Sequence, residues 1–474
     1  MNADPAREQS RRRGMAAVFL ALFALSHGLL WYAYYGHGAK PLIGDEQHYQ
    51  ATALSILTGG SWMQGSIWPP LQPLLLAATY RIFGVHVLAA QVLQGLLFIG
   101  CGVLLRDLWR QLGGGVRAAN AATALFLLSP GIAAYAQWLW PEIPHLALLL
   151  AALCLLARAP APGRGFAAGA CIGLAILAKS LLAGFWPVFL LAFVRGHRPR
   201  FAWAAALAFA GGLALPTTPA LLEGWHRHGR PMIADSSAYN LWIGLTDRWR
   251  SDYVEDMGGR TLPAFLASGE TPAERNALYL DKARTLVERQ GLLPTLAEQS
   301  GRQYFRLFSA KTPLVSQLPG PACAGHLSVY RTPPWLTRTL TLGNDLAHAL
   351  ILAAAALGVA CWRRRPGRMM AIIAVFSAYQ LALFLVLHVK ARFLLPMLPF
   401  LCGFAGSFLT AWRAAPAGAC PPQSHPAVAP APSVAMVGSP LSLSPGRLGI
   451  GALLAALLLV LAFAGPLLDR SCAG

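Results

Sequence analysis

Two adjacent carboxylates, Asp45 and Glu46, follow the first long apolar segment of the chain. Acidic residues are scarce in this region, since only Asp107 and Glu142 join them between residues 9 and 220. A carboxylate at such a place can mark a solvated helix N-terminus, which favours negative charge. It can also serve as a base that takes a proton from a reacting group. The residues alone leave both interpretations open.

Cationic residues occupy two further places between apolar segments. Lys179 lies inside the long apolar stretch 165–194, while His388, Lys390 and Arg392 separate two later apolar segments. Lysine and arginine hold phosphate groups, arginine often through two parallel hydrogen bonds. The alternative is that these long side chains only reach toward the membrane surface. The position of these segments relative to the membrane distinguishes phosphate binding from the second interpretation.

The composition indicates a membrane protein. The chain has 474 residues, 56% hydrophobic and 12% charged, with a mean hydropathy of +0.49, whereas soluble domains carry about 25% charged residues. The net charge of +19 does not indicate nucleic-acid binding, because arginines cluster in short links between apolar segments, as in cytoplasmic loops. The eight cysteines are scattered singly, without zinc-type spacing.

Apolar length and arginine position predict an all-α, multi-pass protein with about eleven membrane-spanning helices, its N-terminus cytoplasmic and its C-terminus outside. We expect a surface-lying helix over 68–83, which begins among prolines, and a short helix over 48–57. The predicted spans are 15–35 (as an uncleaved helix), 84–106, 118–137, 141–158, a hairpin within 165–194 with its tip at 178–180, 201–219, 346–361, 369–388, 392–412 and 448–468.

The same pattern divides the chain into sections. We expect a catalytic membrane module over 1–220, which includes a first outer loop at 36–83, and an extracytoplasmic, partly helical domain over 221–344 with amphipathic helices at 271–289 and 294–308. Further membrane helices follow over 345–413, then a Pro/Ala/Ser-rich linker at 414–447, predicted to be cytoplasmic and disordered, and a last helix within 448–474.

This topology brings the charged residues to one face. Asp45 and Glu46, Glu142, Lys179 and the 388–392 cluster all fall at outer helix ends or tight turns. Cations outside run against the positive-inside rule, and ionisable groups near a bilayer are costly and often functional. Together they predict a site for an anionic, lipid-borne substrate, where cations hold a phosphate and a carboxylate accepts a proton.

Six motifs, in order along most of the chain, resemble those of GT-C membrane glycosyltransferases. The nearest group is the protein O-mannosyltransferase and aminoarabinose transferase group, also called glycosyltransferase family 39-like. Gln72 stands where that group usually has tyrosine, and Ala178 where it has threonine, which affects the subfamily rather than the class. The motifs are Asp45-Glu46 with Tyr49, Trp68–Leu75, Pro141-Glu142, Leu174–Lys179, Tyr239–Gly244 and Arg392–Pro399.

The resemblance implies transfer of a hexose or pentose from a polyprenyl phosphate, undecaprenyl phosphate in a bacterium, to a hydroxyl on an unknown lipid, glycan or protein at the outer face of the inner membrane. It implies no required cofactor, although a divalent cation on the carboxylates would be compatible. The implied roles are a general base for Asp45, orientation of hydroxyls for Glu46 and Glu142, phosphate binding for Lys179, His388, Lys390 and Arg392, and substrate contact for Tyr49, Tyr239 and Asn240.

Two other classes of protein are compatible with so many spans. A transporter or flippase for a lipid-linked anion would place polar residues along a path through the bundle, often with inverted repeats. A non-catalytic assembly subunit would leave Asp45 and Glu46 without a role. The gathering of polar residues at one face favours the transferase.

Overall fold

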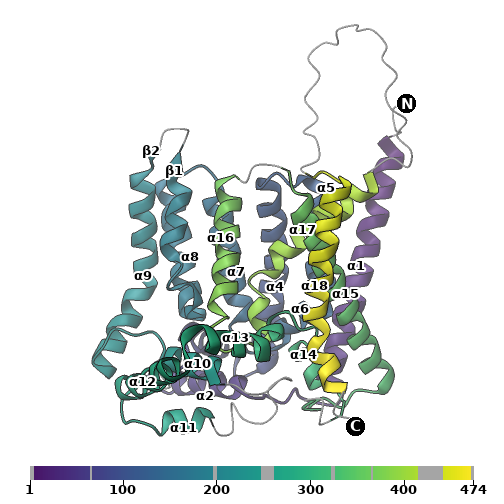
Figure 1. Ribbon diagram of the computed structural model, residues 1–474. Coiled ribbons are helices and arrows are strands. Elements are labelled where there is room, and N and C mark those ends of the chain that lie inside the picture. Colours follow the sequence, from purple (N-terminus) through teal and green to yellow (C-terminus); the bar gives the residue numbers. More distant parts are fainter. Residues whose placement is uncertain are drawn as a thin grey trace.

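The chain folds as a helical bundle with a layer of shorter helices at one end (Figure 1). A computed structural model describes residues 5–63, 67–195, 200–246, 261–321, 326–363, 367–414 and 441–470. Most of the expected linker at 414–447 therefore lies outside the described residues. The predicted all-α class is confirmed, with one addition, a ribbon of two-residue strands, β1 (Val194–Arg195) and β2 (Arg200–Phe201).

Within the described residues, five helices are long and apolar enough to cross a membrane, or six if a pair bent by 64° is one span. The predicted count of eleven is not confirmed, because several apolar segments form helices of only 14–17 residues. The five are α1 (Pro5–Tyr35), α4 (Val87–Gln111), α9 (Trp203–His228), α15 (Pro334–Cys361) and α18 (Pro445–Arg470). The bent pair is α5 (Gly115–Leu128) with α6 (Pro130–Ala133) and η1 (Ala134–Gln137), and the shorter helices are α7 (Glu142–Leu156), α8 (Pro162–Ala178), α16 (Arg368–Leu383) and α17 (Leu398–Ala414).

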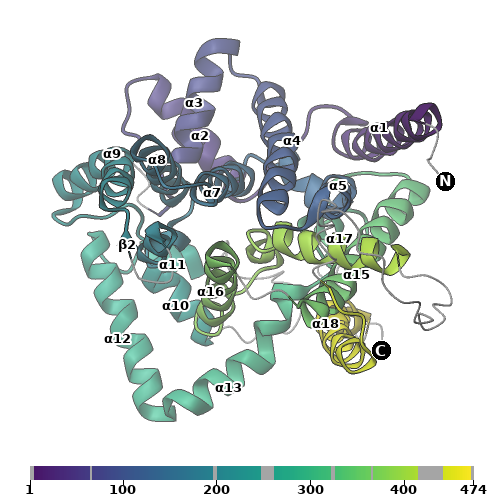
Figure 2. The same ribbon diagram turned by 90° about the horizontal axis from the view of Figure 1, so that it is seen from above.

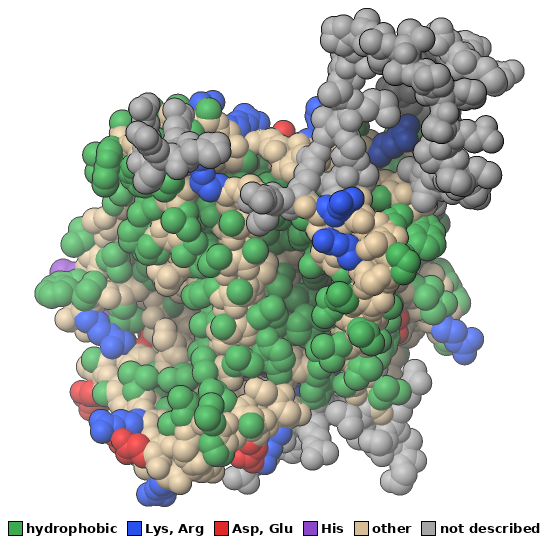
Figure 3. Space-filling view, turned by 45° about the horizontal axis from the view of Figure 1, so that its top comes forward, with side chains coloured by type: hydrophobic (Ala, Val, Ile, Leu, Met, Phe, Trp, Pro, Cys, Tyr) green, Lys and Arg blue, Asp and Glu red, His purple; other side chains and the backbone are tan. Residues whose placement is uncertain are grey.

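The bundle has two distinct ends. The described chain begins in α1 at one end of the bundle and finishes in α18 at the other end. The layer of shorter helices lies at this second end (Figure 1). Hydrophobic side chains cover the middle of the face seen in Figure 3, and most of its acidic side chains lie toward the layered end. The two ends of the bundle therefore differ in both structure and surface charge.

Two helix boundaries differ from the prediction. α9 continues past residue 219 to His228 although it contains Pro216 and Pro219. Between these prolines the Thr217 hydroxyl donates to the Leu213 carbonyl at 2.8 Å. α15 begins at Pro334 rather than at 346. The expected domain boundaries at 220/221 and 344/345 therefore both fall inside helices.

The apolar stretch 165–194 does turn at the predicted point. α8 ends at Ala178, and Lys179 is its C-terminal cap residue. The return leg is not an α-helix but two 3₁₀ segments, η2 (Ser180–Leu182) and η3 (Trp186–Phe193). A 3₁₀ helix rises about 2 Å per residue instead of 1.5 Å, so fewer residues cover the same depth.

The layer at the end of the bundle contains α2 (Asp45–Leu57), α3 (Leu71–Phe83) and the helices of the expected outer domain. α12 and α13 meet at an elbow and run around one side of the layer, from near α9 toward α15 and α18 (Figure 2). The outer-domain elements are α10 (Ser237–Thr246), α11 (Leu262–Leu266), α12 (Pro272–Gln290), α13 (Leu292–Gln303), η5 (Tyr304–Phe308) and α14 (Pro313–Gln317).

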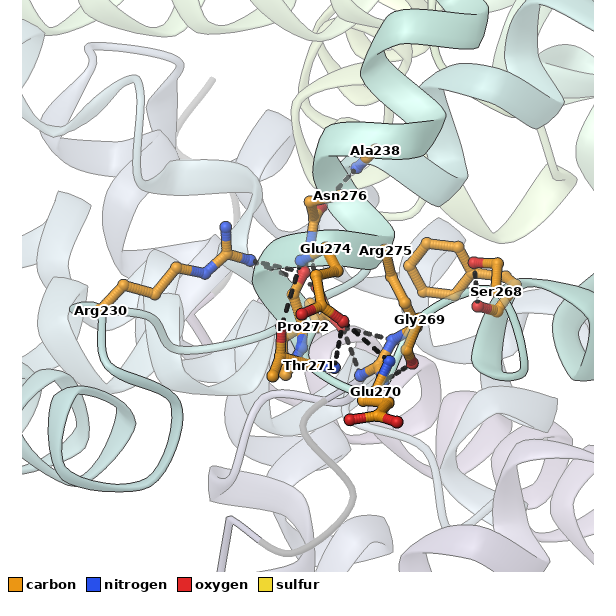
Figure 4. Close-up of polar contacts among 12 residues, drawn as sticks. Arg230, Ala238, Ser268, Gly269, Glu270, Thr271, Pro272, Glu274, Arg275 and Asn276 are labelled. Carbon is orange, nitrogen blue, oxygen red and sulfur yellow. Dashed lines mark hydrogen bonds and ion pairs between the residues drawn. The ribbon is translucent and has the colours of Figure 1, made fainter.

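The predicted helix at 271–289 is confirmed as α12, and local sequence explains both of its ends. Thr271 and Glu274 form a capping box, in which the Thr271 hydroxyl accepts from the Glu274 N–H at 3.2 Å. Gly291 follows the helix with φ of 81°. Buried Asp235 accepts from Arg275 at 2.8 Å and anchors this start, around which Figure 4 shows the polar contacts. The predicted helix at 294–308 corresponds to α13 and η5, and begins two residues earlier.

Candidate active site

Asp45 and Glu46 form the first turn of α2, three residues before the predicted helix start. Gly44, just ahead of them, has φ of 54°, a left-handed conformation that glycine adopts without strain. Consecutive side chains on a helix point about 100° apart at 3.6 residues per turn. The two carboxylates therefore face different surroundings.

Asp45 faces a cavity and is held there by Arg392. The Arg392 Nη2 donates to Asp45 Oδ2 at 2.8 Å, across 347 residues of sequence. The Asp45 side chain remains 22% exposed. Asp45 can therefore reach a group in the cavity while it is paired.

Glu46 faces the protein interior instead. Its oxygens lie 2.6 and 2.7 Å from the Lys40 ammonium, and the side chains of both residues are fully buried. Backbone N–H groups of Leu139 and Ile43 donate to the same carboxylate at 2.9 and 3.2 Å. Burial raises the pKa of Glu46, which Lys40 opposes, and lowers the pKa of Lys40, which Glu46 opposes. This pair joins the loop before α2 to the turn before α7.

Arg392 lies in η7 (Ala391–Leu394), a 3₁₀ turn just before α17. Its guanidinium sits 4.7 Å from the centroid of the Trp140 ring and 5.7 Å from that of Phe393. Its Nε is also 3.7 Å from Glu142 Oε1. Aromatic faces attract a guanidinium and fix its plane. Arg392 is thus held in place by two rings and two carboxylates.

Glu142 and Lys179 form the next layer behind Arg392. The Lys179 ammonium donates to Glu142 Oε1 at 3.0 Å and lies 5.0 Å from the centroid of the Phe393 ring. The Glu142 side chain is 2% exposed and that of Lys179 12%. Neither is among the described residues that line the cavity. They contact Arg392 and its neighbour Phe393. Lys179 was expected to bind phosphate directly, but its side chain does not line the cavity.

The cavity itself has a volume of about 240 Å³ and lies between the bundle end and the outer layer. Its wall combines one carboxylate, three cations, several amide or hydroxyl groups and aromatic rings. The cations come from two separate segments, near 311 and near 391. The lining residues that carry polar or aromatic groups are Asp45, Trp68, Trp140, Ser236, Tyr239, Asn240, Lys311, Ser316, Gln317, His388, Lys390, Arg392 and Phe393.

Charges around the cavity set the protonation of two of its groups. Burial raises the pKa of Asp45, but Arg392, Lys390 and His48 outweigh it and hold that pKa below its ordinary value of 3.8. Burial, together with Lys390, Arg306 and Arg392, holds the pKa of His388 well below its ordinary value of 6.5. At neutral pH Asp45 is therefore ionised, and His388 offers a neutral hydrogen-bonding group rather than the charge that a phosphate ligand was expected to supply.

The three predicted substrate contacts have different positions. Tyr239 and Asn240 line the cavity from α10, where the Tyr239 hydroxyl lies 3.2 Å from the Thr261 hydroxyl. The Asn240 carbonyl accepts from the His388 N–H at 3.0 Å, which ties α10 to the 388–392 segment. Tyr49 is buried, 4% exposed, with its ring centroid 6.0 Å from that of Trp68, and is not among the described lining residues.

Two lysines at the site escaped the sequence analysis, Lys40 and Lys311. A compositional signal would have found them. The chain has only five lysines among its 38 lysines and arginines, and arginine alone supplies the clusters expected in the cytoplasm. Lys311 and Lys390 line the cavity, Lys179 lies directly behind it, and Lys40 pairs with Glu46. The fifth, Lys282, is exposed on α12.

Among the residues that the structure describes, no group of three or more His, Cys, Asp or Glu side chains is placed to hold a metal ion. Asp45 and Glu142 instead have Arg392 and Lys179 within hydrogen-bonding or ion-pair distance. These carboxylates are therefore already matched by cations of the chain itself.

No protein-family model matches the chain, and no curated protein matches it. Among solved structures, it is similar to ArnT from Cupriavidus metallidurans, in the apo state (15% identity, 84% of this chain and 78% of that one, TM-score 0.36) and bound to undecaprenyl phosphate (16%, 85% and 78%, 0.33). It is also similar to the oligosaccharyltransferase AglB from Archaeoglobus fulgidus in complex with an inhibitory peptide and a dolichol-phosphate (12%, 96% of this chain and 56% of that one, 0.45). Both proteins are GT-C glycosyltransferases, the class that the sequence motifs resemble. At these identities and TM-scores the likeness does not extend to the chemistry of this chain.

Proposed function

We propose that the chain is a membrane glycosyltransferase that moves a sugar from a polyprenyl phosphate to a hydroxyl acceptor. The observation that carries this is the cavity wall, where three cations accompany one ionised carboxylate, Asp45. Such a wall suits a substrate that carries a phosphate at one end and a reacting hydroxyl at the other. The cavity is lined by residues at the bundle end and in the outer layer, and in this proposal the polyprenyl tail of the donor remains in the bilayer.

The proposed reaction is a single displacement. Asp45 accepts the proton of the acceptor hydroxyl as that oxygen bonds to the anomeric carbon. The bond between the anomeric carbon and the phosphate oxygen breaks, and its electron pair leaves with the polyprenyl phosphate. Arg392 and Lys390 stabilise the charge that grows on this phosphate, an effect worth on the order of 100-fold in rate for one contact. The configuration at the anomeric carbon is inverted.

The remaining residues have supporting roles in this proposal. Glu142 and Lys179 hold Arg392 in place from behind the cavity wall. Glu46 and Lys40 position the start of α2, and hence Asp45. Tyr239 and Asn240 contact the sugar or the acceptor, while buried Tyr49 supports α2. The scheme needs no metal. We place the site on the outer face of a bacterial inner membrane.

Asp45→Asn tests this proposal. The amide keeps the size of the side chain but cannot accept the proton at neutral pH, so we expect turnover to fall by about 100- to 10,000-fold. Membranes that contain the full chain are assayed with a panel of sugars on undecaprenyl phosphate, by release of undecaprenyl phosphate. Asp281→Asn, on the exposed face of α12, is the matched control and should retain full activity.

A folded Asp45→Asn protein with near-normal turnover would contradict the assignment of the base. Folding is checked by the elution profile of the detergent-solubilised protein and by its melting temperature, both against Asp281→Asn. If the wild-type chain itself releases no undecaprenyl phosphate with any donor and acceptor extract, the proposed function is wrong as a whole.

A further inference from the structure

Gly244 ends the Tyr239–Gly244 motif, and the proposed chemistry gives it no role. It lies in α10 one helical turn after Asn240, so the two residues occupy the same side of the helix. That side lies against residues 386–388, the segment that leads to Lys390 and Arg392. The contact therefore joins two parts of the cavity wall.

α10 approaches this segment backbone to backbone. A Cβ added at Gly244 would lie 2.2 Å from the Val386 carbonyl oxygen and 2.7 Å from the His388 nitrogen. Both atoms belong to the main chain, so no side-chain rotation can relieve the overlap. One turn earlier, the Asn240 carbonyl accepts from the His388 N–H at 3.0 Å. Only glycine at position 244 allows α10 to lie this close.

Two further contacts hold α10 from the outer layer. At its start, the Ala238 N–H donates to the Asn276 side chain of α12 at 3.4 Å (Figure 4). At its end, the buried Gln303 amide of α13 donates to the Gly244 carbonyl. α10 is therefore fixed between the outer layer and the segment before α17.

The spacing between α10 and this segment matters because the two sides have different tasks in the proposed reaction. Tyr239 and Asn240 line the cavity from α10, whereas Lys390 and Arg392 line it from the other side. α10 contacts the sugar or the acceptor, and the second segment holds the phosphate. Phosphate binding needs one side of the contact, whereas transfer needs both sides at the right distance.

A methyl group at position 244 is enough to disturb this distance. Non-bonded heavy atoms have their optimal separation at about 3.5–4.0 Å, whereas the Val386 oxygen would lie 2.2 Å from the added carbon. The two backbones would have to separate by about 1 Å or more. Because Arg392 is held by two rings and two carboxylates, α10 is the part that we expect to move.

We propose that Gly244 is a positioning residue, which sets the distance between the substrate-contacting residues of α10 and the phosphate-binding 388–392 segment. This inference rests on the proposed function. It gives the glycine of the motif a task different from those of Tyr239 and Asn240, since Gly244 is not among the described residues that line the cavity.

Gly244→Ala tests the assignment in the full chain in lipid nanodiscs. A misplacement of about 1 Å can cost on the order of 100-fold in rate, so we expect kcat for the active donor to fall by about that factor. The affinity for undecaprenyl phosphate should stay close to that of wild type. Gly301→Ala, on α13, is the matched control, because a Cβ there would meet no described residue outside its own helix within 4 Å.

Two readouts separate this effect from a general loss of structure. A partly unfolded protein binds fewer molecules of undecaprenyl phosphate per chain, whereas Gly244→Ala should lose turnover at unchanged binding stoichiometry. The second readout is the pH dependence. Arg392, Lys390 and His48 lower the pKa of Asp45, and none of these cations lies on α10. The acidic limb of the pH–rate profile should therefore stay in place although kcat falls.

Gln303→Met reaches the same helix from the other side and introduces no overlap. It removes the amide that donates to the Gly244 carbonyl, so α10 is held less precisely. We expect kcat to fall by about three- to tenfold, the effect of one hydrogen bond, with undecaprenyl phosphate binding unchanged. Gln290→Met, an exposed glutamine at the end of α12, is its matched control.

Turnover of Gly244→Ala equal to that of Gly301→Ala would overturn the inference. A parallel loss of turnover and undecaprenyl phosphate binding in both Gly244→Ala and Gln303→Met would overturn it too, since that is the result of a structural role alone. If Gly244→Ala does not fold, wild-type turnover in Gln303→Met has the same meaning. If the wild-type chain neither transfers sugar nor binds undecaprenyl phosphate, the proposed function fails first, whereas an active wild type with unaffected variants leaves only the role of Gly244 wrong.

Discussion

Arg392 has two kinds of neighbours, and this sets the character of the site. Two aromatic rings hold its plane, while Asp45 and Glu142 share its charge. A carboxylate paired at 2.8 Å is ionised but weakly basic. A substrate phosphate that drew Arg392 toward itself would strengthen Asp45 as a base. Donor binding and base activation would then be coupled in one side chain.

Lys390→Gln tests the charge environment of Asp45. Lys390 lowers the pKa of Asp45, which lies below 3.8, so removal of this cation should raise that pKa. Asp45 acts in its ionised form, and activity is lost as pH falls through its pKa. The acidic limb of the kcat/KM profile should therefore move to higher pH in Lys390→Gln and stay in place in Lys282→Gln. A limb at unchanged pH would mean that another group titrates there.

At the residue scale, the sequence predicted which side chains gather, but it did not predict which of them face the cavity and which face the interior. Asp45, Glu142, Lys179 and Arg392 do form one chain of contacts. Glu46 and Asp45 could not be told apart, because a motif of two adjacent acids does not reveal which one faces inward. The position of Lys311 could not be predicted, because the segment that carries it is fixed by contacts with α15 and α18, which are distant in the sequence.

At the element scale, the buried pair of Lys40 and Glu46 connects the loop before α2 to the turn before α7. Four hydrogen bonds converge on one carboxylate there. The Lys40 ammonium also lies 4.6 Å from the centroid of the Trp138 ring. Since Asp45 precedes Glu46 directly, the direction of Asp45 depends on this connection.

Lys40→Met tests this connection. Removing one partner leaves an uncompensated buried charge, which costs about 3–5 kcal/mol. We expect a clear drop in the melting temperature of the solubilised protein. Lys40→Met combined with Glu46→Leu should recover part of the loss, since an apolar pair needs no partner. Arg284→Met, which breaks an exposed pair with Glu288, is the control with little effect. Equal melting temperatures for Lys40→Met and Arg284→Met would contradict the role of the pair.

Helices with a strong local signal were predicted well. α12 has a capping box at its start and a glycine after its end, and the turn at Lys179 followed from length and charge. The end of α9 and the start of α15 were missed. α9 runs through Pro216 and Pro219, which are usually read as helix ends, and α15 begins at Pro334, well before residue 346. Whether a helix continues through a proline depends on packing in the folded structure, for which the sequence gives little evidence.

At the scale of the whole molecule, lysine is concentrated at one end of the bundle, because four of the five lysines lie in or around the site. Arginine occurs in the short links expected in the cytoplasm and also in the outer layer and the site. The span count could not be predicted from apolar length, because several segments combine short α-helices with 3₁₀ turns. Asp45, Glu142, Lys179 and Arg392 do gather at one end of the bundle, and that this end faces the outside stays a prediction.

The central claim is that this cavity breaks a bond between a sugar and a phosphate, and one measurement separates it from transport. A transporter or flippase leaves its substrate intact and needs a sealed membrane, whereas a transferase works in detergent micelles. Purified full-length protein in detergent is given sugar-linked undecaprenyl phosphates and an acceptor extract, and free undecaprenyl phosphate is measured by mass spectrometry. We predict release of undecaprenyl phosphate matched by an equal amount of glycosylated acceptor, and loss of both in Asp45→Asn. Intact donor throughout, from protein that still binds undecaprenyl phosphate, would contradict the claim.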